Sequence, residues 1–170
     1  MLFIATGGTI DKLPAYLGDG MTFDHDSKNF GETHLPEMLE KAHFVGERVL
    51  LTLFMLDSLD MSDGHRSLLR IAIEGSEHEQ IVVTHGTDTM VETALALSAS
   101  KEIARKTIVL TGAMEPYSMG EMSDAMFNLG TAIAYAQTLP AGVYVAMGGQ
   151  PFNPDNVYKD LEAREFKALR

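Results

Sequence analysis

Apolar runs of strand length recur along the chain, separated by longer stretches in which apolar and polar residues alternate at helical spacing. Short apolar runs bounded by Gly, Asp or Ser are typical of strands that are buried on both faces of a sheet. Five such runs predict strands over residues 2–5, 49–54, 81–83, 107–110 and 143–147.

Between these runs, apolar residues repeat every three or four positions and predict helices over residues 62–74, 89–99 and 124–137. Strands that alternate with helices in this way indicate an α/β fold: a doubly wound, mostly parallel sheet with helices on both faces, as in flavodoxin-like proteins. With 170 residues, 45% of them apolar, the chain is expected to form one domain over residues 1–170.

Two segments depart from this alternation. Residues 11–31 lose the pattern and contain several Pro, Gly and Asp residues, which predicts a long polar loop. We expect it to act as a mobile lid over the loop that follows the first strand. The charged residues at the C-terminal end of the chain predict a short helix.

Composition narrows the range of partners. The 13 Lys and Arg against 24 Asp and Glu give a net charge of −11, which disfavours nucleic acid and anionic membrane surfaces. We therefore expect a small-molecule substrate or a protein partner. There is no cysteine, so disulfides, thiolate metal sites and a cysteine nucleophile are excluded.

The first apolar run is only as long as a strand and follows no basic region, which predicts neither a signal peptide nor a membrane span. A cytoplasmic location is the expectation. The 6 histidines show no metal-ligand spacing, so we expect no metal and no cofactor.

Two of the loops that leave predicted strands are rich in hydroxyl groups. The first is T-G-G-T-I at residues 6–10, and the second is T-H-G-T-D-T at residues 84–89. In an open parallel sheet such loops collect at one edge, where ligands bind. Gly8 would let the backbone approach a ligand and offer an N–H donor, with the Thr9 hydroxyl beside it. The alternative is that Gly7 and Gly8 only form a tight turn and that Thr9 acts as a cap.

In the second loop, Thr89 and Glu92 fit a capping box at a helix start. Thr87 and Asp88 are then left without an obvious structural task, and a helix N-terminus favours an anionic ligand. The alternative is that Thr87 and Asp88 are only polar residues at the start of a helix, without a function in a site. His85, in a glycine turn, is interpreted as a brace for the backbone.

A third polar segment, residues 57–62, follows the second predicted strand at the same edge. Ser58 could bond whatever lies between the other loops, or Ser58, Asp60 and Ser62 could simply turn the chain and cap the next helix. Lys159 stands in a charged tail, where a solvated surface role is usual.

Taken together, these segments resemble the bacterial-type L-asparaginases over nearly the whole chain. The family motifs correspond to T-G-G-T-I at 6–10, S-x-D-M at 58–61, T-H-G-T-D-T-M-x-E-T-A at 84–94, G-A-M-x-P at 112–116, D-x-x-x-N at 124–128 and V-x-K at 157–159. The T-H-G-T-D-T stretch is specific to this family and its glutaminase relatives.

The resemblance implies a role for each matched residue. Thr9 would be the nucleophile, with Thr87, Asp88 and Lys159 as a second catalytic set. Ser58 would bind the substrate carboxylate. The remaining implied site residues are Gly8, Asp57 and Gly86 as substrate-binding residues, Ala113 through its carbonyl, and Tyr16 as the lid tyrosine.

The chain also departs from the family. Leu59 stands where a common branch has glutamine, and Asp11 and Lys12 replace small residues after the first motif. Longer members have a second domain whose acidic residue, supplied by a neighbouring subunit, holds the amino group of the substrate, and we expect this domain to be missing here. We therefore expect a short form of the family in which another copy completes the site, and hence a homodimer or larger homo-oligomer.

The resemblance implies hydrolysis of asparagine to aspartate and ammonia through a threonyl acyl-enzyme, with minor activity on glutamine. A domain that binds asparagine or aspartate without turning it over is the alternative. A signalling receiver domain is a third interpretation, but receivers use a clustered acidic phosphorylation site, which hydroxyl-rich loops do not provide.

Overall fold

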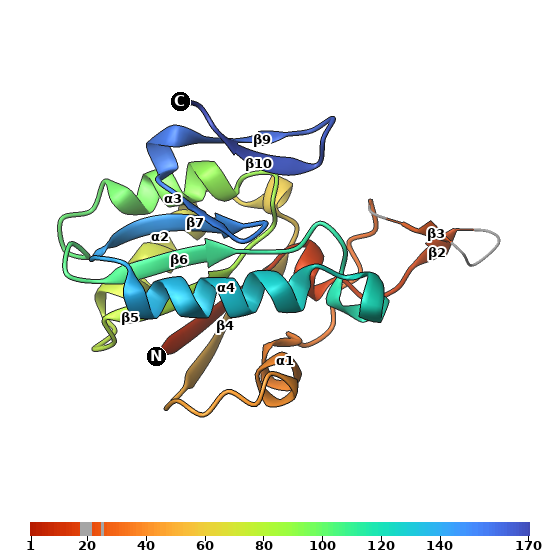
Figure 1. The fold of residues 1–170 in the computed structure, drawn as a ribbon, viewed down its shortest axis with the longest axis horizontal. Coiled ribbons are helices and arrows are strands. Elements are labelled where there is room, and N and C mark those ends of the chain that lie inside the picture. The colour runs from red at the N-terminus through yellow and green to blue at the C-terminus, as the bar shows by residue number, and fades with distance from the viewer. Residues whose placement is uncertain (18–21, 25) are drawn as a thin grey trace.

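A six-stranded sheet forms the centre of the molecule (Figure 1). The computed structural model describes residues 1–17, 22–24 and 26–170, with the backbone alone for residues 16, 17, 22 and 23. The strand order is β4-β1-β5-β6-β7-β8, with β8 antiparallel to β7 and the other neighbours parallel. The strands are β1 (Leu2–Gly7), β4 (Val49–Leu56), β5 (Gln80–Thr84), β6 (Thr107–Thr111), β7 (Gly142–Met147) and β8 (Gln150–Phe152). The five predicted strands are confirmed.

Helices cover both faces of this sheet. On one face, α2 (Asp63–Glu74) and α3 (Met90–Ser98) contribute Leu69, Ile73 and Leu97 to a buried cluster with the sheet. On the other face, α1 (Leu35–Lys41) and α4 (Ala125–Thr138) pack their own cluster. The predicted doubly wound α/β architecture and its three helices are confirmed, whereas α1, which has only 7 residues, was not predicted.

The winding of the chain reverses between β1 and β5. From β1 the chain crosses to β4 on one side and then returns to β5 on the other side of β1. The loops that leave β1 and β5 therefore diverge at the edge of the sheet, which is where doubly wound folds bind ligands. Thr9 and Thr87 lie in these two loops.

Part of the segment over residues 11–31 is more regular than predicted. A 3₁₀ turn, η1 (Thr9–Asp11), follows β1, and two short antiparallel strands, β2 (Tyr16–Leu17) and β3 (Thr22–Phe23), form a hairpin that projects from the sheet (Figure 1). Lys12 pairs with Phe30 across the base of this segment. Its action as a lid stays a prediction.

The predicted helix at the C-terminal end is wrong. The chain instead forms the 3₁₀ turn η4 (Pro154–Asn156) and an antiparallel hairpin of β9 (Val157–Asp160) and β10 (Glu165–Ala168). Phe166 is buried in the core while its neighbours Glu165 and Lys167 face outward, which is the alternation of a strand. This hairpin places Lys159 at the edge of the sheet.

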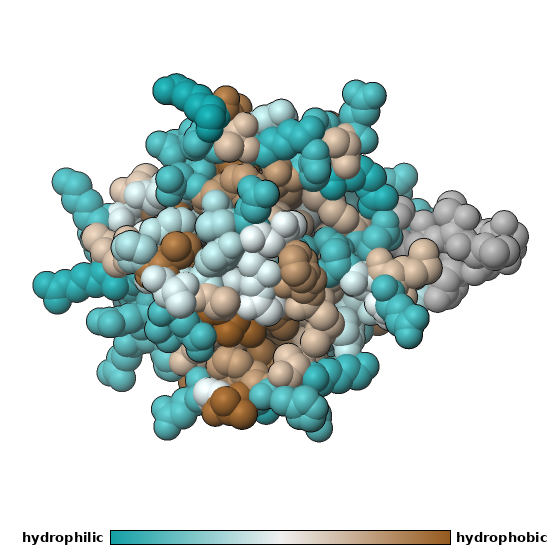
Figure 2. All heavy atoms as spheres, viewed as in Figure 1, coloured by the Kyte–Doolittle hydropathy of each residue, from teal (hydrophilic) through white to brown (hydrophobic). Residues whose placement is uncertain are grey.

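The surface is charged over much of its area but carries apolar side chains along one margin. Edge strand β4 exposes Val49, Leu50 and Leu51, and Val45 precedes it. Figure 2 shows apolar side chains gathered on the lower part of the face, where Figure 1 places β4 and α1. Among the described residues, no helix has both the length and the apolar character needed to cross a membrane.

Candidate active site

The turns that follow β1 and β5 touch through their backbones. A Cβ atom added to Gly8 would lie 2.2 Å from the amide nitrogen of Gly86, and Gly8 has a φ of +83°. Both the space and the dihedral angle therefore require glycine at this position. The Gly8 N–H donates to the carbonyl of Leu56 at 2.9 Å, so the end of β4 joins the same cluster. The prediction that Gly8 offers this N–H to a ligand is therefore wrong, because the end of β4 already uses it.

Ser58 closes this cluster from the third loop. A Cβ atom on Gly86 would lie 2.6 Å from Ser58 Oγ, and the Ser58 residue is 2% exposed. Its hydroxyl has no hydrogen-bond partner in the part of the chain that the structure describes. A buried hydroxyl without a partner is costly, so this group is free to bond a ligand.

The predicted capping box at Thr89 is wrong. Thr89 occupies the N-cap position of α3, but its side chain makes no capping hydrogen bond. Its hydroxyl instead donates to the carbonyl of Ser58 at 2.8 Å, which ties the second and third loops together. The helix that follows Ser58 does have a capping box, formed by Ser62 and His65, as the capping interpretation of Ser62 predicted.

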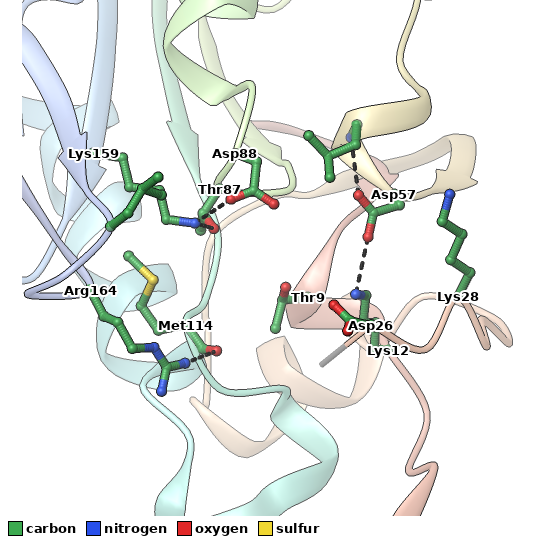
Figure 3. A pocket seen from close by; sticks show the side chains of 12 residues that line it. Thr9, Lys12, Asp26, Lys28, Asp57, Thr87, Asp88, Met114, Lys159 and Arg164 are labelled. Carbon is green, nitrogen blue, oxygen red and sulfur yellow. Dashed lines mark hydrogen bonds and ion pairs between the residues drawn. The ribbon is translucent and has the colours of Figure 1, made fainter. Parts of the chain in front are cut away.

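Thr87, Asp88 and Lys159 form a connected set. The Lys159 ammonium donates to Thr87 Oγ1 at 2.8 Å and to Asp88 Oδ1 at 2.5 Å. The side chain of Lys159 is 17% exposed and that of Asp88 is 40% exposed, so the set lies at the wall of a cavity rather than in the core. Figure 3 shows Lys159 reaching from the tail hairpin toward the loop after β5.

Thr9 faces the same cavity, which has a volume of about 600 Å³. The Thr9 hydroxyl makes no hydrogen bond with any described residue, and Figure 3 places it between the Lys159 set and the loop after β4. The residues that line the cavity are Thr9, Lys12, Asp26, Lys28, Asp57, Leu59, Thr87, Asp88, Met114, Lys159, Leu161 and Arg164.

The turn that carries Thr9 is anchored by Asp11. The buried Asp11 carboxylate accepts hydrogen bonds from the His34 N–H at 2.8 Å and the Thr33 hydroxyl at 3.0 Å. Burial raises the pKa of this carboxyl, although both hydrogen bonds act in the opposite direction. The start of α1 therefore fixes η1.

The motif D-x-x-x-N shapes the loop after β6. Asp124 accepts the backbone N–H groups of Met114 and Glu115 at 2.9 and 3.0 Å, and Asn128 donates to the carbonyl of Gly112 at 3.0 Å. Ala113, between these anchors, is fully buried, while Met114 lines the cavity. The predicted role of the Ala113 carbonyl stays a prediction.

His85 braces the backbone, as predicted. Its Nδ1 lies 2.7 Å from the carbonyl oxygen of Gly86, and the residue is fully buried. Burial lowers the pKa of His85 to about 4 despite that hydrogen bond, so the imidazole is neutral at pH 7. A neutral ring with its Nδ1 proton donated to Gly86 holds the turn in place.

Sequence reasoning did not single out all of the charged residues around the cavity. Lys12 pairs with Asp57 at 3.0 Å, and Arg164 bonds both Glu115 and the carbonyl of Met114. The only sequence signal for Lys12 was its departure from the small residue of the family motif. Nothing local marked Arg164. The side chain of Tyr16 lies outside the described part of the chain.

Together, the fold and the site define a doubly wound α/β protein with a hydroxyl-lined pocket at the switch point of its sheet. The family described as "Asparaginase, N-terminal" matches residues 1–170, and the chain belongs to this family.

Similar proteins are named as L-asparaginases, as glutaminase-asparaginases or as amidotransferase subunits. The chain is 32% identical over 168 residues to a probable periplasmic L-asparaginase of Haemophilus influenzae, covering 92% of this chain and 45% of that protein. It is 35% identical over 171 residues to a glutamyl-tRNA(Gln) amidotransferase subunit of Methanococcus vannielii, covering 98% and 38%. The chain thus spans less than half the length of these relatives.

Solved structures agree with this assignment. The thermostable L-asparaginase of Thermococcus kodakarensis superposes with a TM-score of 0.77 at 26% identity, over 99% of this chain and 50% of that one. A probable cytoplasmic L-asparaginase of Campylobacter jejuni gives 0.75 at 26% identity, over 98% and 50%. Since relatives are named for both compartments, the location of this chain stays a prediction.

Proposed function

We propose that this chain hydrolyses L-asparagine to L-aspartate and ammonia through an ester on Thr9. The observation that carries the proposal is the convergence of four segments on one cavity. Thr9, Asp57 and the set of Thr87, Asp88 and Lys159 line this cavity and come from the loops after β1, β4 and β5 and from the tail hairpin. The buried Ser58 hydroxyl directly follows Asp57 in the loop after β4. The family membership supports the same chemistry.

The first half of the reaction forms the ester. Thr9 Oγ1 attacks the side-chain amide carbon of asparagine, and backbone N–H groups of the two turns other than that of Gly8, which donates to Leu56, receive the developing oxyanion. The C–N bond then breaks, and ammonia leaves with the proton that the Thr9 hydroxyl has lost. Thr87 and Lys159, which are hydrogen-bonded to each other, are the groups we assign to carrying that proton.

The second half releases the product. Water attacks the ester carbonyl, the bond to Thr9 Oγ1 breaks, and that oxygen regains a proton. Ser58, with its hydroxyl unpaired among the described residues, is assigned to the substrate carboxylate. Gly8 and Gly86 hold the loops after β1, β4 and β5 against one another, because neither position leaves room for a side chain, and we assign them to shaping the substrate site. Asp57 holds the start of η2 (Ser58–Asp60) through the Leu59 N–H at 3.0 Å.

The direct test is ammonia release from asparagine by the wild type, Thr9→Ala and Thr87→Val. We expect both variants to lose activity by at least about a hundredfold, and Thr9→Ser to retain more than Thr9→Ala because it keeps a hydroxyl. Undiminished turnover by folded Thr9→Ala would refute the role of Thr9. Calorimetric binding of aspartate without any ammonia release by the wild type would instead favour the non-catalytic binding domain.

The same measurement of ammonia release tests activity on glutamine and a role in amide transfer. Glutamine is one methylene longer than asparagine, a difference that pockets distinguish by only about 1–3 kcal/mol, so minor glutaminase activity is expected. The identity to an amidotransferase component favours a second candidate, action on an amide within a larger assembly. Ammonia release by the purified chain alone would argue against a requirement for such partners.

We also propose that the chain forms a homodimer or larger homo-oligomer. The apolar edge formed by Val49, Leu50 and Leu51 supports this, because an exposed edge strand pairs readily with another strand. Light scattering would test it, and a monomer that hydrolyses asparagine would contradict the idea that a second copy completes the site.

A further inference from the structure

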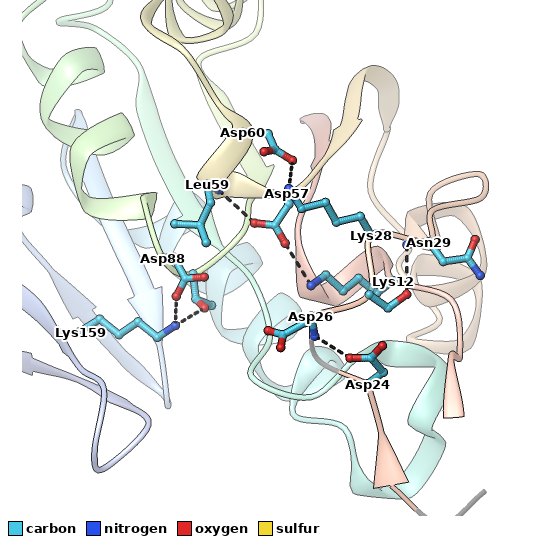
Figure 4. Close-up of polar contacts among 12 residues, drawn as sticks. Lys12, Asp24, Asp26, Lys28, Asn29, Asp57, Leu59, Asp60, Asp88 and Lys159 are labelled. Atoms are coloured by element: carbon cyan, nitrogen blue, oxygen red, sulfur yellow. Dashed lines mark hydrogen bonds and ion pairs between the residues drawn. The ribbon is translucent and has the colours of Figure 1, made fainter. Parts of the chain in front are cut away.

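A second ion pair, formed by Lys12 and Asp57, lines the same cavity. The ammonium of Lys12 lies 3.0 Å from Asp57 Oδ2, with side-chain exposures of 3% and 12%. The other oxygen of Asp57 accepts the N–H of Leu59 at 3.0 Å. Figure 4 shows Asp57 held from both sides, by Lys12 and by Leu59.

Asp57 is ionised at neutral pH. Burial acts to raise its pKa, but the Leu59 N–H and the Lys12 ammonium, with a smaller contribution from the charge of Lys28, outweigh burial, and the pKa is lowered overall. A full negative charge therefore stands at the residue directly before Ser58. Without a counter-charge, it would repel any carboxylate that approached the buried Ser58 hydroxyl, and more strongly than in water because the site is partly desolvated.

The position of Lys12 follows from the turn that carries Thr9. The Lys12 N–H donates to the carbonyl of Thr9 at 3.1 Å and ends η1, and the Ser118 hydroxyl donates to the Lys12 carbonyl at 3.0 Å. The backbone of Lys12 is thus fixed next to Thr9, and its nearly buried side chain runs along the cavity wall to Asp57 in the loop after β4. Figure 3 shows the Lys12 nitrogen joined to Asp57, with Thr9 nearby.

Stability alone does not account for this pair. Desolvating two charges costs about as much as their attraction returns, so a buried ion pair is weak evidence for a stabilising role. A function in the cavity is the better explanation, because Lys12 and Asp57 both line it.

We propose that Lys12 is a specificity-determining residue: it neutralises Asp57, so that the pocket accepts a ligand whose carboxylate lies against Ser58. This inference rests on the proposed function, because it assigns the carboxylate of the amino acid substrate to that place. Lys12 transfers no proton in this scheme. It sets the local charge and the position of Asp57.

The experiment compares two ligands that differ by one charge. L-Aspartate carries the α-carboxylate, whereas its α-amide, isoasparagine, has a neutral group at the same place. Calorimetry gives the Kd of each for the wild type, Lys12→Met, Lys12→Arg and the double variant Lys12→Met/Asp57→Asn. Lys41→Met is the matched control, because Lys41 forms an exposed ion pair with Glu37 on α1, away from the cavity.

For Lys12→Met we expect aspartate to bind at least about tenfold more weakly, which corresponds to about 1.4 kcal/mol, and isoasparagine to change much less. With asparagine as substrate, KM should rise more than kcat falls. Lys12→Arg keeps the charge and should bind aspartate nearly as the wild type does. The double variant removes both charges, so aspartate binding should recover toward the wild-type value.

Three results would overturn the inference. They are an unchanged Kd for aspartate in Lys12→Met, an equal loss for both ligands, and a double variant as weak as Lys12→Met. If the single variant does not fold, the double variant and Lys12→Arg still decide the matter. Wild-type binding of aspartate with the expected pattern but no ammonia release would leave this inference standing and defeat only the proposed hydrolysis.

Discussion

The ammonium of Lys159 lies 2.8 Å from the hydroxyl of Thr87, although 72 sequence positions separate the two residues. Thr87 belongs to the loop after β5, and Lys159 belongs to a hairpin outside the main sheet. The contact exists only because the tail of the chain folds back over the edge of the sheet. Activity should therefore depend on side chains that are far apart in the sequence.

Replacing Lys159 by methionine should abolish most of the activity while leaving the fold intact. The ammonium contacts Thr87 and Asp88, and loss of a proton-transferring group typically costs about 10²–10⁴ in rate. Stability should change by no more than about 1 kcal/mol, because partly exposed ion pairs contribute little. Ammonia release and urea unfolding measure the two effects.

The matched control is Lys167→Met. Lys167 lies on β10, next to β9, and pairs with Asp160 and Glu165 away from the cavity. Its replacement should leave turnover within about twofold of the wild type. An equal loss of activity in both variants would show that the hairpin as a whole, rather than Lys159, is needed.

Gly8→Ala should destabilise the protein by more than about 2 kcal/mol and remove activity. The new methyl group would meet the backbone of Gly86, and alanine is strained at a φ of +83°. By contrast, Gly130→Ala should stabilise by up to about 1 kcal/mol, because Gly130 lies in helix α4 with open space around it. Chemical unfolding of the two variants checks the prediction, which fails if they are equally stable.

The buried histidine should make the protein less stable in mild acid. The pKa of His85 is about 4 in the folded state and 6.5 in its unperturbed state, so the unfolded chain binds the proton more tightly. Its contribution, about 3 kcal/mol, is complete above pH 6.5 and is lost as pH falls toward 4. Asp11, with a raised pKa, acts in the opposite direction.

His85→Gln isolates the contribution of the histidine. Asp11 is present in both proteins, so it cancels in the comparison. We expect the free energy of unfolding of the variant to depend less steeply on pH than that of the wild type between about pH 4 and 6.5. Urea titrations at half-unit pH steps measure this, and parallel pH profiles would contradict the assignment.

Asp124→Ala should weaken both the fold and the catalytic efficiency. The carboxylate accepts the N–H groups of Met114 and Glu115 and the amide of Asn128, so its loss leaves several donors without a partner. We expect a loss of about 1–3 kcal/mol in stability and a lower kcat/KM, because Met114 lines the cavity. Asp155→Ala, at an exposed turn, should change neither property. Equal behaviour of the two variants would refute the role of Asp124.

The elements that the sequence predicts correctly are those whose residue pattern has a single physical cause. Strands such as β5 and β6 are buried on both faces, so their apolar runs stand out, and the glycines at positions 8 and 86 mark the places where two backbones meet. Loops that leave parallel strands gather at one edge of the sheet, and this rule predicts that Thr9 lies near Thr87 and Asp88. The structure brings these predicted residues to one cavity.

Other parts depend on tertiary contacts that no local pattern records. The tail was expected to be helical because it is charged, yet burial of Phe166 against the core selects a hairpin. Thr89 was predicted to cap a helix, yet its hydroxyl donates to the carbonyl of Ser58 in another loop. Lys12 gave no sign of its partner, because Asp57 is distant in sequence and the pair forms only when η1 meets the end of β4.

The β9–β10 hairpin forms its own two-stranded sheet, separate from the central one, and it carries Lys159 and Arg164 to one wall of the cavity. The glycine contacts between the loops after β1, β4 and β5 tolerate no added atoms, so that part of the site is conformationally constrained. Variation among homologous proteins, or deliberate redesign toward other amides, would therefore be accommodated most easily at hairpin positions other than Lys159, such as Arg164, where a side chain can be exchanged without disturbing the backbone packing of the sheet edge.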